Sequence, residues 1–166
     1  MGLEVLNLTV RVRDKVVLRR ANLKVDYGTI HVVMGPNGSG KSSLAYAILG
    51  REGYEVLEGD IRLDGESILG LETHERAMKG IFLSMQDPPV VPGVRLSTLI
   101  IASMNKKRGV SELTRISDPR VVKAMQKVAS DIGLPLELLQ REVNVGFSGG
   151  ERKRGELLQA VVLDPK

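Results

Sequence analysis

The 166 residues include 24 basic and 20 acidic side chains, 42% hydrophobic residues and no cysteine. The lack of cysteine excludes disulfides, thiolate metal ligands and a cysteine nucleophile. No apolar run is long enough to span a membrane and no signal-peptide pattern is present, which predicts a cytoplasmic protein without direct membrane insertion. A chain of this length is expected to bury one globular core.

The chain opens with short segments that predict β-strands. Residues 7–13 alternate between apolar and polar side chains, as expected for a half-buried strand. Residues 15–18 and 21–25 predict two further short strands, and the Tyr-Gly pair at 27–28 turns into the next segment. That segment, 29–34, is largely apolar and predicts a buried strand.

A glycine-rich segment follows and has the pattern of a phosphate-binding loop, or P-loop. Residues 35–42 read Gly-Pro-Asn-Gly-Ser-Gly-Lys-Ser. In such loops backbone N–H groups converge on phosphate oxygens, the lysine reaches the β- and γ-phosphates, and the serine hydroxyl ligates Mg²⁺. A helix is predicted over 41–49, closed by Gly50. The candidate nucleotide-binding residues are Gly35, Asn37, Gly38, Ser39, Gly40, Lys41, Ser42 and Ser43, with Lys41 also catalytic and Ser42 a metal ligand.

The middle of the chain predicts a strand over 60–63, a short helix over 73–78 and an apolar strand over 81–85 that stops at Gln86. Prolines at 88, 89 and 92 then predict an extended segment without ladder hydrogen bonds.

The rest of the chain has a helical pattern. Asp118-Pro119 is a helix start signal, and apolar residues recur at helical spacing from Val121 to Ile132. A short helix through Leu139 follows, and a last helix is predicted over 150–162, with Ser148 as its candidate cap.

Charge is segregated along the chain. Residues 51–75 hold eight acidic side chains against two arginines, and residues 95–130 hold eight basic side chains against two acidic ones. Such blocks are usually solvated faces, and the alternative is a basic surface that docks an acidic partner. Nucleic acid is not expected as a partner, because the basic segment has no aromatic residue for base stacking.

A second motif, Phe-Ser-Gly-Gly-Glu, occupies 147–151. Alone it is a capped turn. Together with the P-loop, Gln86 and the helical insertion between them, it resembles the Leu-Ser-Gly-Gly-Gln signature of the ATP-binding-cassette (ABC) ATPases. Arg154 matches the arginine that follows this signature, and Gln86 matches the Q-loop glutamine.

The resemblance covers essentially the whole chain and implies an α/β fold, a P-loop NTPase of the ABC ATPase type with an N-terminal antiparallel β part and a helical insertion. Residues 1–166 then form the N-terminal part of one ABC ATPase domain. Its expected parts are an α/β nucleotide-binding core (1–92), a helical subdomain (93–146), and the signature motif with its helix (147–166).

A narrower match is to the SufC family, the cytosolic ABC-type ATPases of the Suf iron–sulfur cluster assembly system. It rests on residues 50–56, 86–88, 92–94 and 143–154. The match implies ATP and Mg²⁺ as cofactors, Suf scaffold proteins of the SufB/SufD type as partners, and a second ATPase subunit on ATP binding.

The resemblance also implies roles for further residues. Ser148, Gly149 and Gly150 are expected to bind in trans the γ-phosphate held by the opposing subunit, and Gln86 is expected to be catalytic and to complete Mg²⁺ coordination. The basic run at 152–154 is interpreted either as a contact to this polyphosphate or as a solvated basic turn.

Two features depart from the family pattern. No aromatic residue precedes Tyr27, so adenine is expected to meet an aliphatic side chain such as Val16. Hydrolysis in the family needs a Walker B strand ending in Asp-Glu and a later switch histidine, and Asp164-Pro165-Lys166 matches the turn before that strand. The chain is therefore expected to lack the C-terminal part of the core, to fold marginally alone and not to hydrolyse ATP. The alternatives are the ATP-binding subunit of an ABC membrane transporter and a non-catalytic nucleotide-binding fragment.

Overall fold

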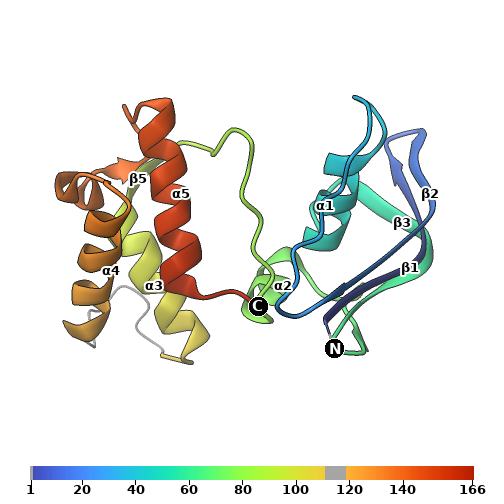
Figure 1. The fold of residues 1–166 in the computed structure, drawn as a ribbon, viewed down its shortest axis with the longest axis horizontal. Helices are drawn as coiled ribbons and strands as arrows, with labels where there is room; N and C mark the ends of the chain where they lie inside the picture. Colours follow the sequence, from blue (N-terminus) through green and yellow to red (C-terminus); the bar gives the residue numbers. More distant parts are fainter. Residues whose placement is uncertain (1, 111–118) are drawn as a thin grey trace. The chain divides into compact units, whose positions relative to one another are not determined.

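The computed structural model describes residues 2–110 and 119–166, which form two compact units. The first comprises residues up to 83 together with Lys166, and the second comprises residues 84–165 (Figure 1). Each unit buries its own cluster of apolar side chains. The prediction of a single core is therefore wrong, because a sheet and a group of helices each cover their own apolar face.

The first unit is built on a four-stranded antiparallel sheet with the strand order β2-β1-β3-β4. This confirms the predicted N-terminal antiparallel part. The segments at 15–18 and 21–25 form one long strand rather than two, because both pair with β1. The strands are β1 (Gly2–Val12), β2 (Lys15–Asp26), β3 (Tyr54–Leu63) and β4 (Glu66–Ser67).

An irregularity crosses three neighbouring strands of this sheet. Asn7 in β1 and Arg20 in β2 have positive φ angles of 48° and 46°, and Gly59 in β3 has a φ of 92°. A Cβ atom on Gly59 would lie 2.4 Å from the carbonyl oxygen of Leu6, so only glycine fits there. The Asn7 backbone N–H donates to Asn22 Oδ1 at 2.9 Å, and this hydrogen bond joins the irregular point of β1 to β2. The register of the β1–β2 pair and of the β1–β3 pair shifts near these residues, and we call Asn7, Arg20 and Gly59 together the bulge line.

Two helices belong to the first unit, α1 (Lys41–Leu49) and α2 (Thr73–Met78), and both match the predicted ranges. Helix α1 ends as predicted at Gly50, whose φ is 73°. The Arg76 guanidinium from α2 donates through Nη1 to the carbonyl oxygens of Ala47 (2.9 Å) and Ile48 (3.0 Å), so an arginine caps the C-terminus of α1. A Cβ atom on Gly50 would lie 2.7 Å from Arg76 Cζ, which gives glycine a second reason to stand there.

Two predicted strands do not form. Residues 29–34 and 81–85 have no strand conformation. In the first segment Ile30 is 93% exposed and Met34 is 85% exposed, so the prediction of a buried strand is wrong. A strand exists through hydrogen bonds to a neighbouring strand, and no strand among the described residues pairs with either segment.

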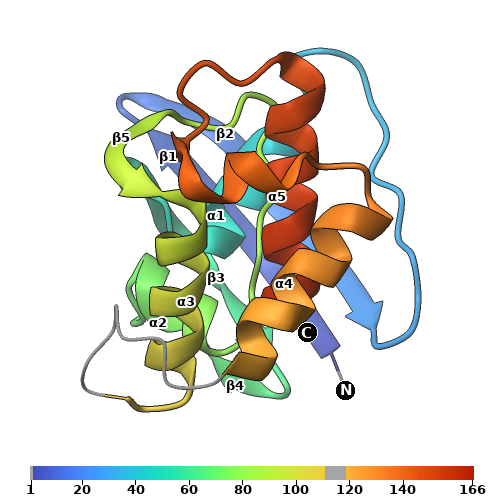
Figure 2. The same cartoon turned by 90° about the vertical axis from the view of Figure 1, so that its left-hand side faces the viewer.

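The second unit is helical, in agreement with the predicted helical insertion (Figure 2). The strand β5 contains Pro92 and pairs with β6, so the expected absence of ladder hydrogen bonds is wrong for this segment. The predicted cap Asp118 lies outside the described residues. No helix in the described part of the chain is long and apolar enough to cross a membrane. The elements are β5 (Val91–Arg95), α3 (Leu96–Lys107), α4 (Pro119–Asp131), the 3-10 helix η1 (Leu136–Gln140), β6 (Glu142–Val143) and α5 (Gly149–Leu163).

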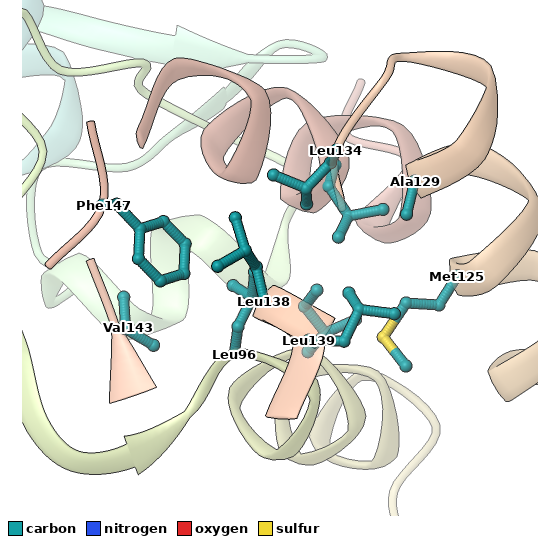
Figure 3. Close-up of a cluster of buried hydrophobic side chains, with 10 residues drawn as sticks. Leu96, Met125, Ala129, Leu134, Leu138, Leu139, Val143 and Phe147 are labelled. Carbon is teal, nitrogen blue, oxygen red and sulfur yellow. The ribbon is translucent and has the colours of Figure 1, made fainter. Parts of the chain in front are cut away.

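The core of the second unit follows from helical spacing. Met125 and Ala129 lie one turn apart on α4 and are buried together. They belong to one cluster with Leu96 at the start of α3, Phe147 of the signature motif and Leu158 of α5 (Figure 3). The signature motif is thus anchored in the helical unit through its phenylalanine.

The second unit begins at Ser84, whereas the sequence analysis expected the helical part to begin after residue 92.

Candidate nucleotide-binding site

The P-loop lies in the first unit, between β2 and α1, and its last glycine is fixed by packing. Gly40 has a φ of 97° and serves as the N-cap residue of α1. A Cβ atom on it would lie 2.7 Å from Leu18 Cδ2 and 3.0 Å from the Val17 carbonyl oxygen, both in β2. The loop approaches the sheet so closely that a side chain at this position would clash.

The N-terminus of α1 has the properties of an anion site. Gly40 supplies no side-chain cap, and the first turn holds no acidic residue. The backbone N–H groups of Ser42 and Ser43 therefore have no capping oxygen within the helix, and with the helix dipole they favour an anion. The Lys41 ammonium donates to the carbonyl oxygens of Gly35 (2.7 Å) and Pro36 (2.8 Å), so the cation lies folded over the loop.

Each unit offers one oxygen-bearing side chain of the kind that suits magnesium. Ser42 offers a hydroxyl oxygen on the first turn of α1, and Gln86 offers an exposed side-chain amide in the second unit. Mg²⁺ prefers hard oxygen ligands and usually takes several from water and substrate phosphates. No group of three or more His, Asp or Glu side chains in the described ranges could hold a metal by itself.

The signature motif forms the N-terminus of α5, and Ser148 caps the helix as predicted. The Ser148 hydroxyl accepts from the Glu151 N–H at 3.3 Å, while the Ser148 N–H donates to Glu151 Oε2 at 2.7 Å. This reciprocal pair is a capping box. The N–H groups of Gly149 and Gly150 have no partner within the helix, and open space surrounds both residues.

The capping box makes the stability of α5 depend on pH. The hydrogen bond from the Ser148 backbone N–H, and then that from its side chain, hold the pKa of Glu151 below its ordinary value. A depressed carboxyl pKa stabilises the fold above the unfolded-state pKa, and this contribution is lost as pH falls through the folded-state pKa. We expect Glu151→Gln to keep the cap but to weaken the dependence of the unfolding free energy on pH in the acidic range. Urea unfolding followed by circular dichroism at several pH values measures this dependence.

Ser148→Ala is the matched variant for this titration. It should cost about 1 kcal/mol at neutral pH, the usual cost of losing a serine cap. It should also return the Glu151 pKa part of the way toward its ordinary value, measured by carboxyl NMR, because it removes the side-chain hydrogen bond and keeps the backbone N–H. An unchanged pKa in Ser148→Ala would contradict the assignment.

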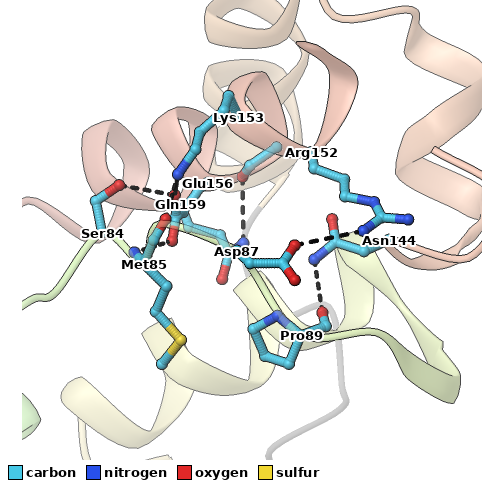
Figure 4. A network of polar contacts seen from close by, with 10 residues as sticks. Ser84, Met85, Asp87, Pro89, Asn144, Arg152, Lys153, Glu156 and Gln159 are labelled. Atoms are coloured by element: carbon cyan, nitrogen blue, oxygen red, sulfur yellow. Dashed lines mark hydrogen bonds and ion pairs between the residues drawn. The ribbon is translucent and has the colours of Figure 1, made fainter. Parts of the chain in front are cut away.

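Two cations of the basic run after the signature have partners within the second unit. Arg152 Nε donates to the Phe147 carbonyl oxygen at 3.2 Å, and its Nη1 lies 3.6 Å from Asp87 Oδ1. The Lys153 ammonium donates to the Met85 carbonyl oxygen and to Glu156 Oε2 (Figure 4). Both interpretations of the sequence therefore miss the internal partners of these two cations.

The structure divides the predicted site residues between the two units. The P-loop residues 35–43 belong to the first unit, and Gln86 belongs to the second unit with Ser148, Gly149 and Gly150. Sequence reasoning missed Glu156, which contacts the chain next to Gln86. Its partners Ser84 and Met85 lie 72 and 71 positions earlier, so no local pattern could have revealed these contacts.

A glycine-rich loop with a following lysine and serine at an uncapped helix N-terminus defines a protein of the P-loop class. The family model described as ABC transporter matches residues 18–166, and the chain belongs to this family.

Several known proteins are similar to the chain. It is 43% identical to a probable ABC transporter ATP-binding protein from Streptococcus pyogenes serotype M18, over 99% of this chain and 63% of that protein. It is 40% identical to the probable ATP-dependent transporter SufC of Escherichia coli, over 99% of this chain and 66% of that protein. The chain thus spans less than two thirds of these relatives. A dimeric ATP-binding cassette solved with ADP and Pi shares the fold, with a TM-score of 0.76, 20% identity, and coverage of 98% of this chain and 70% of that chain.

Proposed function

We propose that the chain is the nucleotide-binding part of a SufC-like ABC ATPase, which couples ATP binding and hydrolysis to iron–sulfur cluster assembly. The observation that carries the nucleotide assignment is the uncapped N-terminus of α1 behind the P-loop, with Lys41 folded over it. The 40% identity to SufC and the signature residues 147–151 support the narrower assignment.

In this proposal the chain has two anion-binding sites, the P-loop and the signature motif at the N-terminus of α5. The P-loop N–H groups and the Lys41 ammonium bind the β- and γ-phosphates, and the Ser42 hydroxyl and the Gln86 amide oxygen would hold Mg²⁺. When bound, the metal would supply positive charge that offsets the negative charge developing on the transferred phosphoryl group. The exposed N–H groups of Gly149 and Gly150, with Ser148, bind the γ-phosphate held by a second subunit. The dimeric state of the solved cassette supports a composite site of this kind.

The proposed partners are Suf scaffold proteins of the SufB/SufD type. The competing assignment is the ATP-binding subunit of a membrane transporter, which the printed name of the Streptococcus pyogenes relative favours. Both assignments use the same nucleotide site and differ in the protein that the helical unit contacts.

Two measurements test the proposal. Titration with a fluorescent ATP analogue, with and without Mg²⁺, tests nucleotide binding, and we expect saturable binding that Mg²⁺ strengthens. Affinity purification of the tagged protein from its own cells, followed by mass spectrometry, tests the partner, and we expect soluble scaffold proteins. Recovery of a membrane permease would overturn the iron–sulfur assignment, and absence of nucleotide binding would overturn both assignments. Turnover measured on material of verified mass separates an enzyme from a non-catalytic binding module.

A further inference from the structure

A buried carboxylate of α5 contacts the segment that precedes Gln86. Glu156 is 7% exposed and lies two turns after the Ser148 cap. Its carboxylate accepts from the Ser84 hydroxyl at 2.7 Å, from the Met85 backbone N–H at 2.5 Å and from the Lys153 ammonium at 3.2 Å (Figure 4). A buried carboxylate is costly unless it is hydrogen-bonded and paired, and here three donors meet that requirement.

The same two side chains of α5 hold both backbone polar groups of Met85. Glu156 accepts from the Met85 N–H, and Lys153 donates to the Met85 carbonyl oxygen. Residues 81–90 form no helix or strand, so the backbone of this segment needs partners other than a β-ladder. Side chains of α5 take the place of a neighbouring strand at this point.

The chain beyond Gln86 has further contacts to the signature region. Asn144 Nδ2 donates to the Pro89 carbonyl oxygen at 2.7 Å. The ion pair between Arg152 and Asp87 is weaker, because the Asp87 side chain is 90% exposed and the charges lie 3.6 Å apart. Gln86 lies between these attachment points with its own side chain exposed. The backbone is therefore fixed on both sides of Gln86, while its amide stays available to a ligand.

We propose that Glu156 is a positioning residue that fixes Gln86 relative to the signature motif, so that the glutamine moves as one body with α5. Glu156 contacts no nucleotide in this assignment and acts through the Ser84 hydroxyl and the Met85 backbone N–H. The inference rests on the proposed function for the role of Gln86 toward Mg²⁺. The attachment itself rests on contacts within the second unit alone.

Hydrogen–deuterium exchange and magnesium titration on the full chain test this inference together. In Glu156→Ala we expect the Met85 amide to exchange at least about 10-fold faster, since it loses its acceptor. The Mg²⁺ concentration that half-saturates binding of the fluorescent ATP analogue should rise roughly 10-fold, the usual effect of losing a group that orients a metal ligand. Binding of the analogue without Mg²⁺ should not change, because the P-loop lies in the other unit.

Two further variants keep the test sharp. Glu156→Gln retains an acceptor for the Met85 N–H without the charge, so its Met85 exchange rate and Mg²⁺ midpoint should stay close to those of the unaltered chain. This variant keeps the test decisive even if Glu156→Ala fails to fold. Met125→Ala destabilises the same unit from its core, away from residues 84–89, and should change neither Met85 exchange nor the Mg²⁺ midpoint.

The outcomes separate this inference from the proposed function. Unchanged Met85 exchange in both Glu156 variants, equal effects in Met125→Ala, or faster exchange with an unchanged Mg²⁺ midpoint would each overturn the positioning role. If the unaltered protein binds no nucleotide, the proposed function fails, and the exchange result alone decides whether Glu156 fixes the segment.

Discussion

Lys41→Ala is expected to weaken binding of the MgATP analogue by roughly 100-fold, the effect of removing one strong charge-assisted contact to phosphate. The Lys41 ammonium is the cation of the P-loop and lies over the loop carbonyls of Gly35 and Pro36. Those carbonyls are exposed and can turn to water, so the variant should keep nearly the stability of the unaltered chain. Fluorescence titration measures the affinity, and urea unfolding measures the stability.

Lys24→Ala is the matched control for this charge change. Lys24 pairs with Glu4 on the sheet at 3.6 Å and remains largely exposed. Lys24→Ala removes the same charge as Lys41→Ala, but outside the P-loop. The affinity for the MgATP analogue should therefore stay within about twofold at physiological salt, where charges are strongly screened beyond about 8 Å. Equal affinity of the Lys41 and Lys24 variants would contradict the nucleotide site.

Arg76→Ala is expected to lower the free energy of unfolding of the first unit by about 3 kcal/mol, because it leaves buried carbonyl oxygens without their charged donor. Arg76 is 4% exposed, and its guanidinium donates to four carbonyl oxygens, two of them at the end of α1. Burial lowers the pKa of this guanidinium. All three tyrosines lie in the first unit, so tyrosine fluorescence in urea reports on this unit by itself.

Two variants bracket the Arg76 effect. Arg76→Lys keeps the charge but loses the planar set of donors, and should fall between the unaltered chain and Arg76→Ala. Arg51→Ala removes an exposed arginine whose Cζ lies 4.5 Å from the centre of the Tyr46 ring, and should cost only about 0.5–1 kcal/mol. A loss for Arg76→Ala no larger than that for Arg51→Ala would show that the buried arginine does not stabilise α1.

Local patterns predicted what local interactions determine. The range of α1, its end at Gly50 and the Ser148 cap of α5 were all predictable, because each depends on residues within one or two turns. The exposure of residues 29–34 was not predictable, since apolar composition shows only that a segment is suited to a strand. Pairing depends on a neighbour that a local window does not contain.

The residues of the candidate site also differ in whether a local sequence pattern reveals their role. The P-loop and signature residues were found from their motifs, because their chemistry depends on closely spaced backbone groups. The roles of Arg76 and Glu156 depend on partners far away in the sequence, such as Ala47 and Met85. Composition alone suggests that both side chains are solvated, as arginine and glutamate usually are.

The bulge line through Asn7, Arg20 and Gly59 also bears on how the sheet avoids misfolding. A slip of one residue between neighbouring strands would turn Leu8 and Val10, both fully buried, toward the solvent. A regular ladder offers many nearly equivalent pairings, whereas a sheet whose irregular points must coincide on three strands has one favoured alignment. Gly59 accepts no side chain there, and Asn7 finds its partner Asn22 only in this alignment. The irregularity thus selects among competing registers during folding.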